Sequence, residues 1–146
     1  MKFISLLISL PFVAFVALGC SGSTATLTSP SSLDVTAPQL PGTWNLVSIR
    51  PAGEAEEAKP SGTSYTLTLV DGRLSTRADC NTCVGTYTLN GRTLMAGPLM
   101  ACTRAACPTM AFENTYMKLL SGESTVSLSG DTVVLTSPRG ILRFTR

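Results

Sequence analysis

The sequence contains no histidine, and this absence excludes several kinds of catalytic site. Neither a Ser-His or Cys-His nucleophile pair nor a zinc site built on histidine can form. Charged residues make up only 14% of the 146 residues, the net charge is +2, and the basic residues are scattered, so the footprint of a nucleic-acid-binding protein is missing. Nothing resembles a phosphate-cradling glycine loop. We expect no enzymatic activity, no cofactor and no nucleic-acid partner.

The N-terminus has the pattern of an export signal. Lys2 supplies a short positive region, residues 3–18 are almost wholly apolar, and the small Gly19 precedes Cys20. The apolar run is too short and too close to the N-terminus for a comfortable membrane span. We predict a signal peptide over residues 1–19.

The residues around Cys20 resemble a bacterial lipobox, in which the cysteine is acylated and becomes the mature N-terminus. That pattern usually has Leu where this chain has Ala17, so an ordinary signal-peptidase cut stays open as the alternative. We predict acylation of Cys20, because a lone cysteine directly after the apolar run is otherwise unexplained. Acyl chains contribute about 0.8 kcal/mol per buried methylene to membrane binding, so several of them would anchor the protein permanently.

The expected location is the bacterial cell envelope. An Asp directly after the acylated cysteine resembles an inner-membrane retention signal, and this chain has Ser21 at that position. In a cell with two membranes this favours the outer membrane, facing the periplasm. Residues 20–41 are the lipidated N-terminus and a tether rich in Ser, Thr and Pro, too poor in apolar residues to offset the entropy of ordering. The tether holds the folded part off the membrane, or is an arm with no further role.

Residues 42–146 alternate apolar and polar side chains and predict one domain, rich in strands. One helix is expected at 109–121, where aromatic and leucine residues share a face and Glu113 complements the N-terminal dipole. Strands are expected at 43–49, 64–70, 73–76, 84–89, 92–95, 125–129, 132–136 and 141–145. These elements predict an α+β fold, a small antiparallel, curved or barrel-like sheet with one covering helix.

Four of the five cysteines lie on either side of a predicted hairpin whose turn is Asn90-Gly91. A hairpin brings its outer ends together, so among three possible connectivities we favour nested disulfides. These join Cys80 to Cys107 and Cys83 to Cys102.

Two other uses of these cysteines stay open. A four-thiolate zinc site is one, although the spacing fits it only loosely. A redox pair of Cys80 and Cys83 is the other, but the residues after Cys83 have the composition of a strand, whereas redox thiols are activated at a helix N-terminus. We expect no metal.

A series of short motifs runs through the predicted domain in a fixed order. They are Gly42-Thr43-Trp44-Asn45-Leu46, Asp71-Gly72-Arg73, Cys80-Asn81, Gly85-x-Tyr87, Asn90-Gly91, Pro98-Leu99, Thr103-Arg104-Ala105-Ala106-Cys107, and a helix with Glu113 and Tyr116. Together they resemble the META domain, the family of the bacterial heat-shock lipoprotein HslJ.

The resemblance implies a small α+β domain with a barrel-like sheet and an envelope role associated with stress and antibiotic tolerance. It implies no catalytic residue. It also implies that Cys80 and Cys107 are the recurring pair, with Cys83 and Cys102 as additions in this chain.

Two function classes follow. The first is a non-enzymatic stress-response or envelope-stability factor that binds a protein or lipid partner through the barrel mouth. An exposed apolar patch around Met95, Leu99 and Met100 would favour it. The alternative is a secreted inhibitor-like module that docks on a partner enzyme through a protruding, disulfide-braced loop at residues 96–101.

Arg104 is the candidate ligand contact, because an arginine held between Cys102 and Cys107 could present a fixed fork to an anion. A structural salt bridge to Asp79 is the favoured alternative. Asp79 and Glu113 could form a carboxylate pair. We favour simpler roles for them, as a loop residue and a helix N-terminal charge.

Overall fold

Most strands of the domain pair with the strand that follows them in the chain. The computed structural model describes residues 39–62 and 64–146, so the predicted signal peptide, Cys20 and most of the predicted tether lie outside the described residues. The elements are β1 (Gly42–Pro51), β2 (Thr66–Val70), β3 (Arg73–Ala78), β4 (Asn81–Asn90), β5 (Thr93–Ala96), β6 (Ala101–Cys102), α1 (Met110–Leu120), β7 (Gly122–Ser129), β8 (Thr132–Ser137) and β9 (Gly140–Thr145).

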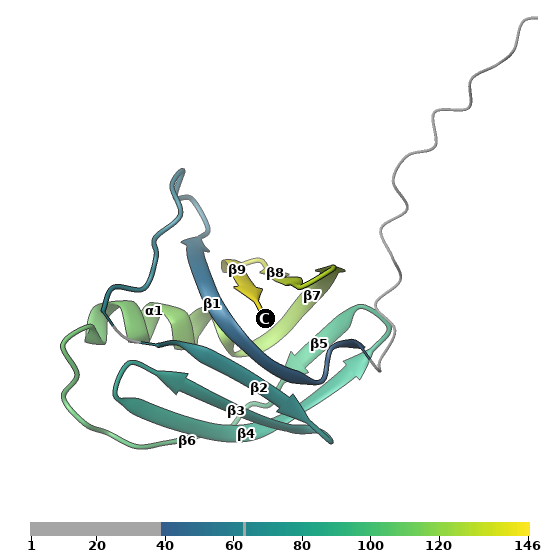
Figure 1. The fold of residues 1–146 in the computed structure, drawn as a ribbon, viewed down its shortest axis with the longest axis horizontal. Coiled ribbons are helices and arrows are strands. Elements are labelled where there is room, and N and C mark those ends of the chain that lie inside the picture. Colours follow the sequence, from purple (N-terminus) through teal and green to yellow (C-terminus); the bar gives the residue numbers. More distant parts are fainter. Residues whose placement is uncertain (1–38, 63) are drawn as a thin grey trace, which may run out of the picture.

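Eight of the strands close into an antiparallel barrel (Figure 1). The ring runs β1-β2-β3-β4-β5-β7-β8-β9, and β9 pairs back onto β1. The short β6 adds to β4 outside the ring. Closure leaves the eight ring strands without a free sheet edge, the usual site of unwanted pairing. The expected barrel-like sheet with a covering helix is thus roughly right, and the fold is mainly β.

Alternation of side chains builds the core. In β9, Gly140, Leu142 and Phe144 are buried while the residues between them are partly exposed, and Val133 and Leu135 follow the same rule in β8. Successive side chains of a strand point to opposite faces, so the inward set of all strands meets inside the ring. This one-sided burial is why most strands could be predicted from the sequence.

Two of the tight turns show what the hairpin signals do and do not determine. Asp71 and Gly72 form the predicted turn between β2 and β3, with φ of 47° and 74°. The predicted Asn90-Gly91 turn is one residue off. Asn90 pairs with Thr93, so Gly91, with φ of 56°, is the first central residue and Asn90 has no positive φ. A glycine at the first central position is typical of a type II′ turn rather than of the predicted type I′ turn.

The helix covers one end of the barrel, the left end in Figure 1. Tyr116 of α1 lies in the core, with ring centroids 5.3 Å from Tyr65 and 6.4 Å from Phe144. Thr76 Oγ1 donates to the Thr66 carbonyl, so the Tyr116 hydroxyl donates to Thr76 Oγ1 at 2.7 Å. Burial raises the pKa of Tyr116, which stays protonated and hydrogen-bonded. Among the described residues, no helix is long and apolar enough to cross a membrane.

The opposite end is filled by the chain that enters β1. The sequence assigns Leu40 to the tether because its surroundings are rich in Ser, Thr and Pro, but it is fully buried. Its carbonyl accepts a hydrogen bond from Trp44 Nε1 at 2.9 Å. The Arg146 guanidinium lies over the Trp44 ring at 4.1 Å and donates to the Gln39 carbonyl at 2.5 Å. A single leucine gives no periodic signal, so its place in the core was not predictable.

The charged loop after β1 is held to the barrel by Glu57. Ser48 Oγ donates to Glu57 Oε2 at 2.6 Å, and Arg143 forms an ion pair with Glu57 at 3.3 Å. The pKa of Glu57 is lowered, chiefly by the hydrogen bond from Ser48 and further by Arg143. Desolvation acts in the opposite direction but is outweighed. Residues 52–59 are exposed, so the loop lies on the surface, where a cluster of charges in a loop is usually found.

Ser48→Ala is expected to raise the pKa of Glu57 toward its ordinary value. A carboxyl whose pKa is lowered by folding stabilises the protein above its unfolded pKa, and this contribution is lost as the pH falls through the folded value. In Ser48→Ala the free energy of unfolding should therefore fall less as the pH is lowered through the pKa of Glu57. The difference should be small, because the ion pair is exposed. The measurement is an NMR titration of the Glu57 carboxyl, and an unchanged pKa would contradict the assignment.

Candidate functional site

Two disulfides fasten the segment between β3 and α1 to the barrel. Cys80 is bonded to Cys107, 27 residues away, and Cys83 to Cys102, 19 residues away. This is the nested arrangement that the hairpin geometry favours, with Cys83 and Cys102 directly paired on β4 and β6. The four sulfurs are consumed, so neither the four-thiolate zinc site nor the free Cys80/Cys83 redox pair forms in this structure.

A two-residue turn at Asp79-Cys80 places the first disulfide. Ala78 pairs with Asn81, and Asp79 has a φ of 56°. Aspartate tolerates this left-handed conformation, but without a glycine the turn gives little signal in the sequence. β4 therefore begins at Asn81 rather than at the predicted residue 84, and Cys80 lies in the turn, where it meets Cys107.

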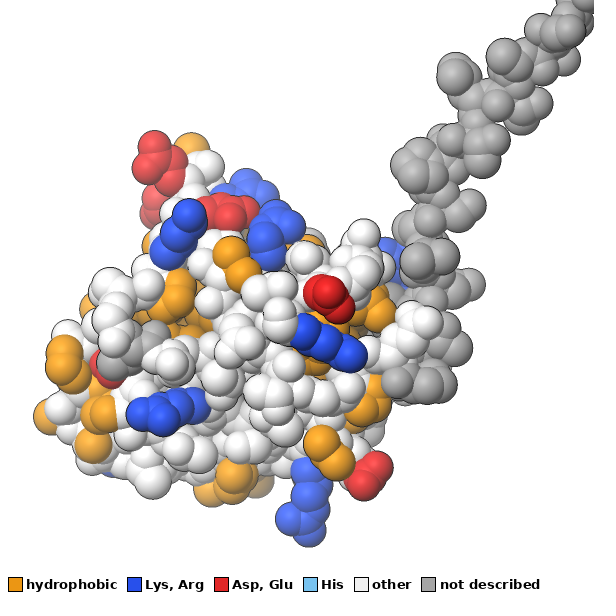
Figure 2. Space-filling model, in the orientation of Figure 1, with side chains coloured by type: hydrophobic (Ala, Val, Ile, Leu, Met, Phe, Trp, Pro, Cys, Tyr) orange, Lys and Arg blue, Asp and Glu red, His pale blue; other side chains and the backbone are white. Residues whose placement is uncertain are grey.

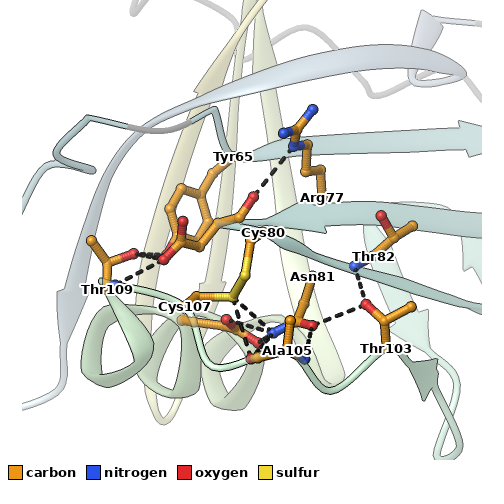
Figure 3. Close-up of a disulfide and its surroundings, with 11 residues drawn as sticks. Tyr65, Arg77, Cys80, Asn81, Thr82, Thr103, Ala105, Cys107 and Thr109 are labelled. Carbon is orange, nitrogen blue, oxygen red and sulfur yellow. Dashed lines mark hydrogen bonds between the residues drawn. A yellow bond between two sulfur atoms is a disulfide. The ribbon is translucent and has the colours of Figure 1, made fainter.

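Asn81 is the buried residue that joins β4 to the cysteine segment and to α1 (Figure 3). Its Oδ1 accepts from the Ala105 N–H at 2.8 Å and from Thr103 Oγ1 at 3.0 Å. Its Nδ2 lies 3.0 and 3.1 Å from the two carboxylate oxygens of Glu113, and 3.1 Å from both the Ala105 carbonyl and Cys107 Sγ. An amide carries only two hydrogens, so four acceptors share them.

A second chain of hydrogen bonds fixes the start of α1. Asp79 Oδ2 accepts from the backbone N–H of Thr109 at 2.8 Å and from Thr109 Oγ1 at 2.5 Å. Because that hydroxyl hydrogen is given to Asp79, Tyr65 donates to Thr109 Oγ1 at 2.9 Å. Burial raises the pKa of Tyr65; the hydrogen bond with Thr109 opposes this, and the charges of Asp79 and Glu113 add to it. Asp79 is thus a turn residue that also complements the helix dipole.

The structure brings Asp79, Cys107 and Glu113 together. One carboxylate oxygen of each acid and the Cys107 sulfur lie within 4.8 Å of one another, and all three residues are buried. The sulfur belongs to a disulfide and is not a thiolate, so a metal ion held by this trio does not fit. Both carboxylates are engaged in the structural hydrogen bonds described above, and we assign no catalytic role to them.

A cavity of about 520 Å³ opens beside this network. One wall is the segment after β6, and the other is the first turns of α1. Glu113 is the acidic residue of the lining and is only 9% exposed. The lining residues are Asn81, Cys102, Thr103, Arg104, Ala105, Ala106, Met110, Glu113, Asn114 and Met117.

Arg104, the ligand contact predicted from the sequence, lies at this cavity and is exposed. Within residues 39–62 and 64–146 it makes no hydrogen bond or ion pair. The salt bridge found in this part of the chain joins Arg143 and Glu57. The salt bridge to Asp79, favoured from the sequence, is therefore not formed. Asp79 is fully buried and points to Thr109 instead.

The loop between β5 and β6 lies along β4. The Gly97 N–H donates to the Thr86 carbonyl at 2.7 Å, and a Cβ at Gly85 would be 2.9 Å from Met100 Cγ. The loop is therefore held against the barrel at Gly97 and Met100, whereas Leu99 between them is exposed.

Apolar side chains are nevertheless exposed here. Leu99 is 85% exposed and Met95 38%, whereas Met100 packs against the core. In the face drawn in Figure 2, apolar side chains form small groups and charges of both signs are interspersed. Of the three residues of the expected apolar patch, Leu99 and Met95 are thus exposed and Met100 is partly buried.

The comparison with protein-family models decides the family. The model of the META domain matches residues 37–146. The chain belongs to the META domain family. The resemblance read from the sequence motifs is confirmed. None of the curated proteins matches this META domain protein.

Solved structures share its fold. The META domain protein is similar to a protein from Burkholderia xenovorans solved by NMR, with 27% identity, a TM-score of 0.60, and coverage of 72% of this chain and 81% of that one. A second protein solved by NMR has 21% identity, a TM-score of 0.60 and coverage of 76% and 94%. A DUF4847 family protein from Bacteroides vulgatus, at 15% identity, has a TM-score of 0.52 and coverage of 71% and 91%.

Several residues of the META domain site were not predicted from the sequence. The sequence marks Asn81 only as part of the Cys80-Asn81 motif, although its hydrogen bonds organise the site. Met110 and Met117 lie about two helical turns apart on α1 and line the cavity. The motif around Asn81 was the available signal, since a buried polar residue beside cysteines requires partners.

Proposed function

We propose that this META domain protein is an exported lipoprotein of the bacterial cell envelope. Acyl chains on Cys20 anchor it, in the outer membrane where the cell has two, and it acts without enzymatic activity as a stress-response or envelope-stability factor that binds a protein or lipid. The observation that carries this proposal is the pair of disulfides across residues 80–107. Disulfides persist outside the reducing cytoplasm, in the compartment to which an export signal leads.

The cavity beside α1 supports a binding role. Its wall at Cys102 is tied to β4 by a disulfide, and its wall at Ala105 is tied to Asn81 by hydrogen bonds. A wall fixed in this way loses little conformational entropy when a partner binds, which favours affinity. The carboxylates nearby serve the turn and the helix start, which favours binding over catalysis.

The cavity also lies away from the point where the chain enters the domain. Residues 39–41 lie at the end of the barrel opposite α1, whereas α1 forms one wall of the cavity (Figure 1). A partner could therefore reach the cavity while the N-terminal side of the protein is held at a membrane.

Cys20→Ser is expected to abolish acylation and release the protein from the membrane fraction. The test is growth of the producing bacterium with a labelled fatty acid, followed by membrane fractionation. Ser21→Ala, which leaves the cysteine intact, is the matched control and should keep both label and membrane association. An unlabelled, water-soluble wild-type protein would overturn the lipoprotein proposal in favour of an ordinary signal-peptidase cut.

A further inference from the structure

We propose that the cavity beside α1 binds a small zwitterionic amphiphile. Its ammonium group pairs with Glu113, its anionic group pairs with Arg104, and its apolar part lies against Met110 and Met117. This names a ligand class for the site, and it rests on the proposed function as a binding protein of the envelope.

The carboxylate of Glu113 is the group that a cationic ligand group would stabilise. It lines the cavity, is 9% exposed, and its hydrogen-bond partner among the described residues is the Asn81 amide, which it shares with the Ala105 carbonyl and Cys107 Sγ. A carboxylate has about four acceptor positions, so positions remain open for another donor. No lysine or arginine within the described residues forms an ion pair with it. Burying a charge without a cation is costly, and an ammonium group offsets that cost.

The surroundings favour an ammonium group over a metal ion or an anion. Asp79, which does not line the cavity, lies behind Glu113 with carboxylate oxygens within 4.8 Å, so the buried end of the site is negative. A divalent cation such as Ca²⁺ takes six to eight oxygen ligands. Here Asn81 Oδ1 already accepts two hydrogen bonds and Asp79 Oδ2 is held by Thr109, so too few oxygens are free for such an ion.

Arg104 adds the opposite charge at the same cavity. It is exposed, and its guanidinium forms no hydrogen bond or ion pair within the described part of the chain. Arginine presents donors in a planar fork that binds carboxylate or phosphate. A ligand with only an ammonium group would be repelled by Arg104, and one with only an anionic group by Glu113. A zwitterion satisfies both.

The remaining walls suit an apolar body. Met110 is 44% exposed, Met117 packs partly against the core, and both line the cavity with the Cys102 side of a disulfide. Methionine side chains adapt to ligands of varied shape. The volume, about 520 Å³, lies within the range of small-molecule sites. A short acyl chain or an aliphatic side chain fits this description.

The test compares probes that differ by one charged group, added to the full-length protein in phosphatidylglycerol nanodiscs and measured by calorimetry against empty nanodiscs. L-leucine represents a free zwitterion, and dihexanoyl phosphatidylethanolamine represents a lipid headgroup. Their matched counterparts without the amine are 4-methylpentanoate and dihexanoyl phosphatidylethanol. We expect at least one zwitterion to bind about tenfold more tightly than its counterpart, as one charge-assisted hydrogen bond provides.

Two variants test the assigned contacts. Glu113→Gln should abolish the preference for the probe with the amine. Arg104→Gln should lower the affinity for the zwitterion about tenfold. The exposed Glu123 and Arg73 supply the controls, Glu123→Gln and Arg73→Gln, which should bind as the wild type does. Because Arg104 is exposed, its variant remains informative if Glu113→Gln fails to fold.

The outcomes are distinct. Binding of leucine alone identifies a free small molecule, and binding of the phosphatidylethanolamine alone identifies a lipid headgroup; either supports the proposal. Failure of both zwitterions to bind, equal binding without the amine, or unchanged binding by Arg104→Gln overturns it. None of these results bears on whether Cys20 is acylated, so failure here is distinguishable from failure of the lipoprotein assignment.

Discussion

Replacing Cys80 and Cys107 together with alanine is expected to lower the free energy of unfolding by about 3 to 4 kcal/mol. Their bond closes a loop of 27 residues, and in the chain-entropy model its loss restores that freedom to the unfolded state. The measurement is urea denaturation of the variant and the wild type under non-reducing conditions.

The second disulfide provides the comparison for this experiment. The bond between Cys83 and Cys102 spans 19 residues, so its removal should cost slightly less, about 3 kcal/mol. Because each bond shortens the effective loop that the other closes, removing both bonds should cost more than the sum of the two separate losses. A loss below about 1 kcal/mol for the longer loop would show that the disulfides are not what stabilises the segment.

Asn81→Asp is expected to destabilise the domain by about 3 kcal/mol or more at pH 7. The substitution replaces an amide donor with a third carboxylate, directly against Glu113 and close to Asp79. Folding would raise the pKa of the new carboxyl, so the penalty should shrink as the pH falls and the group binds a proton. Denaturation at pH 7 and pH 4 measures both effects.

Two further variants separate the charge from the lost hydrogen bonds. Asn81→Ala removes the same hydrogen bonds without adding a charge, so it should be milder at pH 7 and lack this pH dependence. Asn90→Asp adds a carboxylate at an exposed turn and should change stability by no more than about 0.5 kcal/mol. If Asp at position 81 were tolerated at pH 7 as well as Ala, the negative site described here would be wrong.

Much of the barrel was predictable because burial acts on single strands. The alternation in residues 66–70 and 132–137 records which side faces the core, and Asp71-Gly72 fixes a turn by local conformation alone. The elements that were not predicted lack such local signals. β6 has only two residues, and its pairing depends on Cys83 meeting Cys102 across 19 residues.

The site was less predictable, because its parts meet only in the folded chain. Asn81 binds the backbone of Ala105 and the side chain of Glu113, residues that lie 24 and 32 positions later. The sequence indicated Arg104 as a ligand contact, and the structure places it at a cavity, but the apolar wall from Met110 and Met117 depends on how α1 packs. The helix pattern gave Glu113 a place in the first turn without indicating that its side chain is buried.

The intact mass of the protein purified from membranes, with and without reduction, tests the central claim most directly. A disulfide-braced lipoprotein is predicted to begin at an acylated Cys20 and to gain four hydrogens on reduction, two for each bond. A mass that matches an unmodified N-terminus together with four free thiols would contradict both the anchor and the disulfide-fastened site.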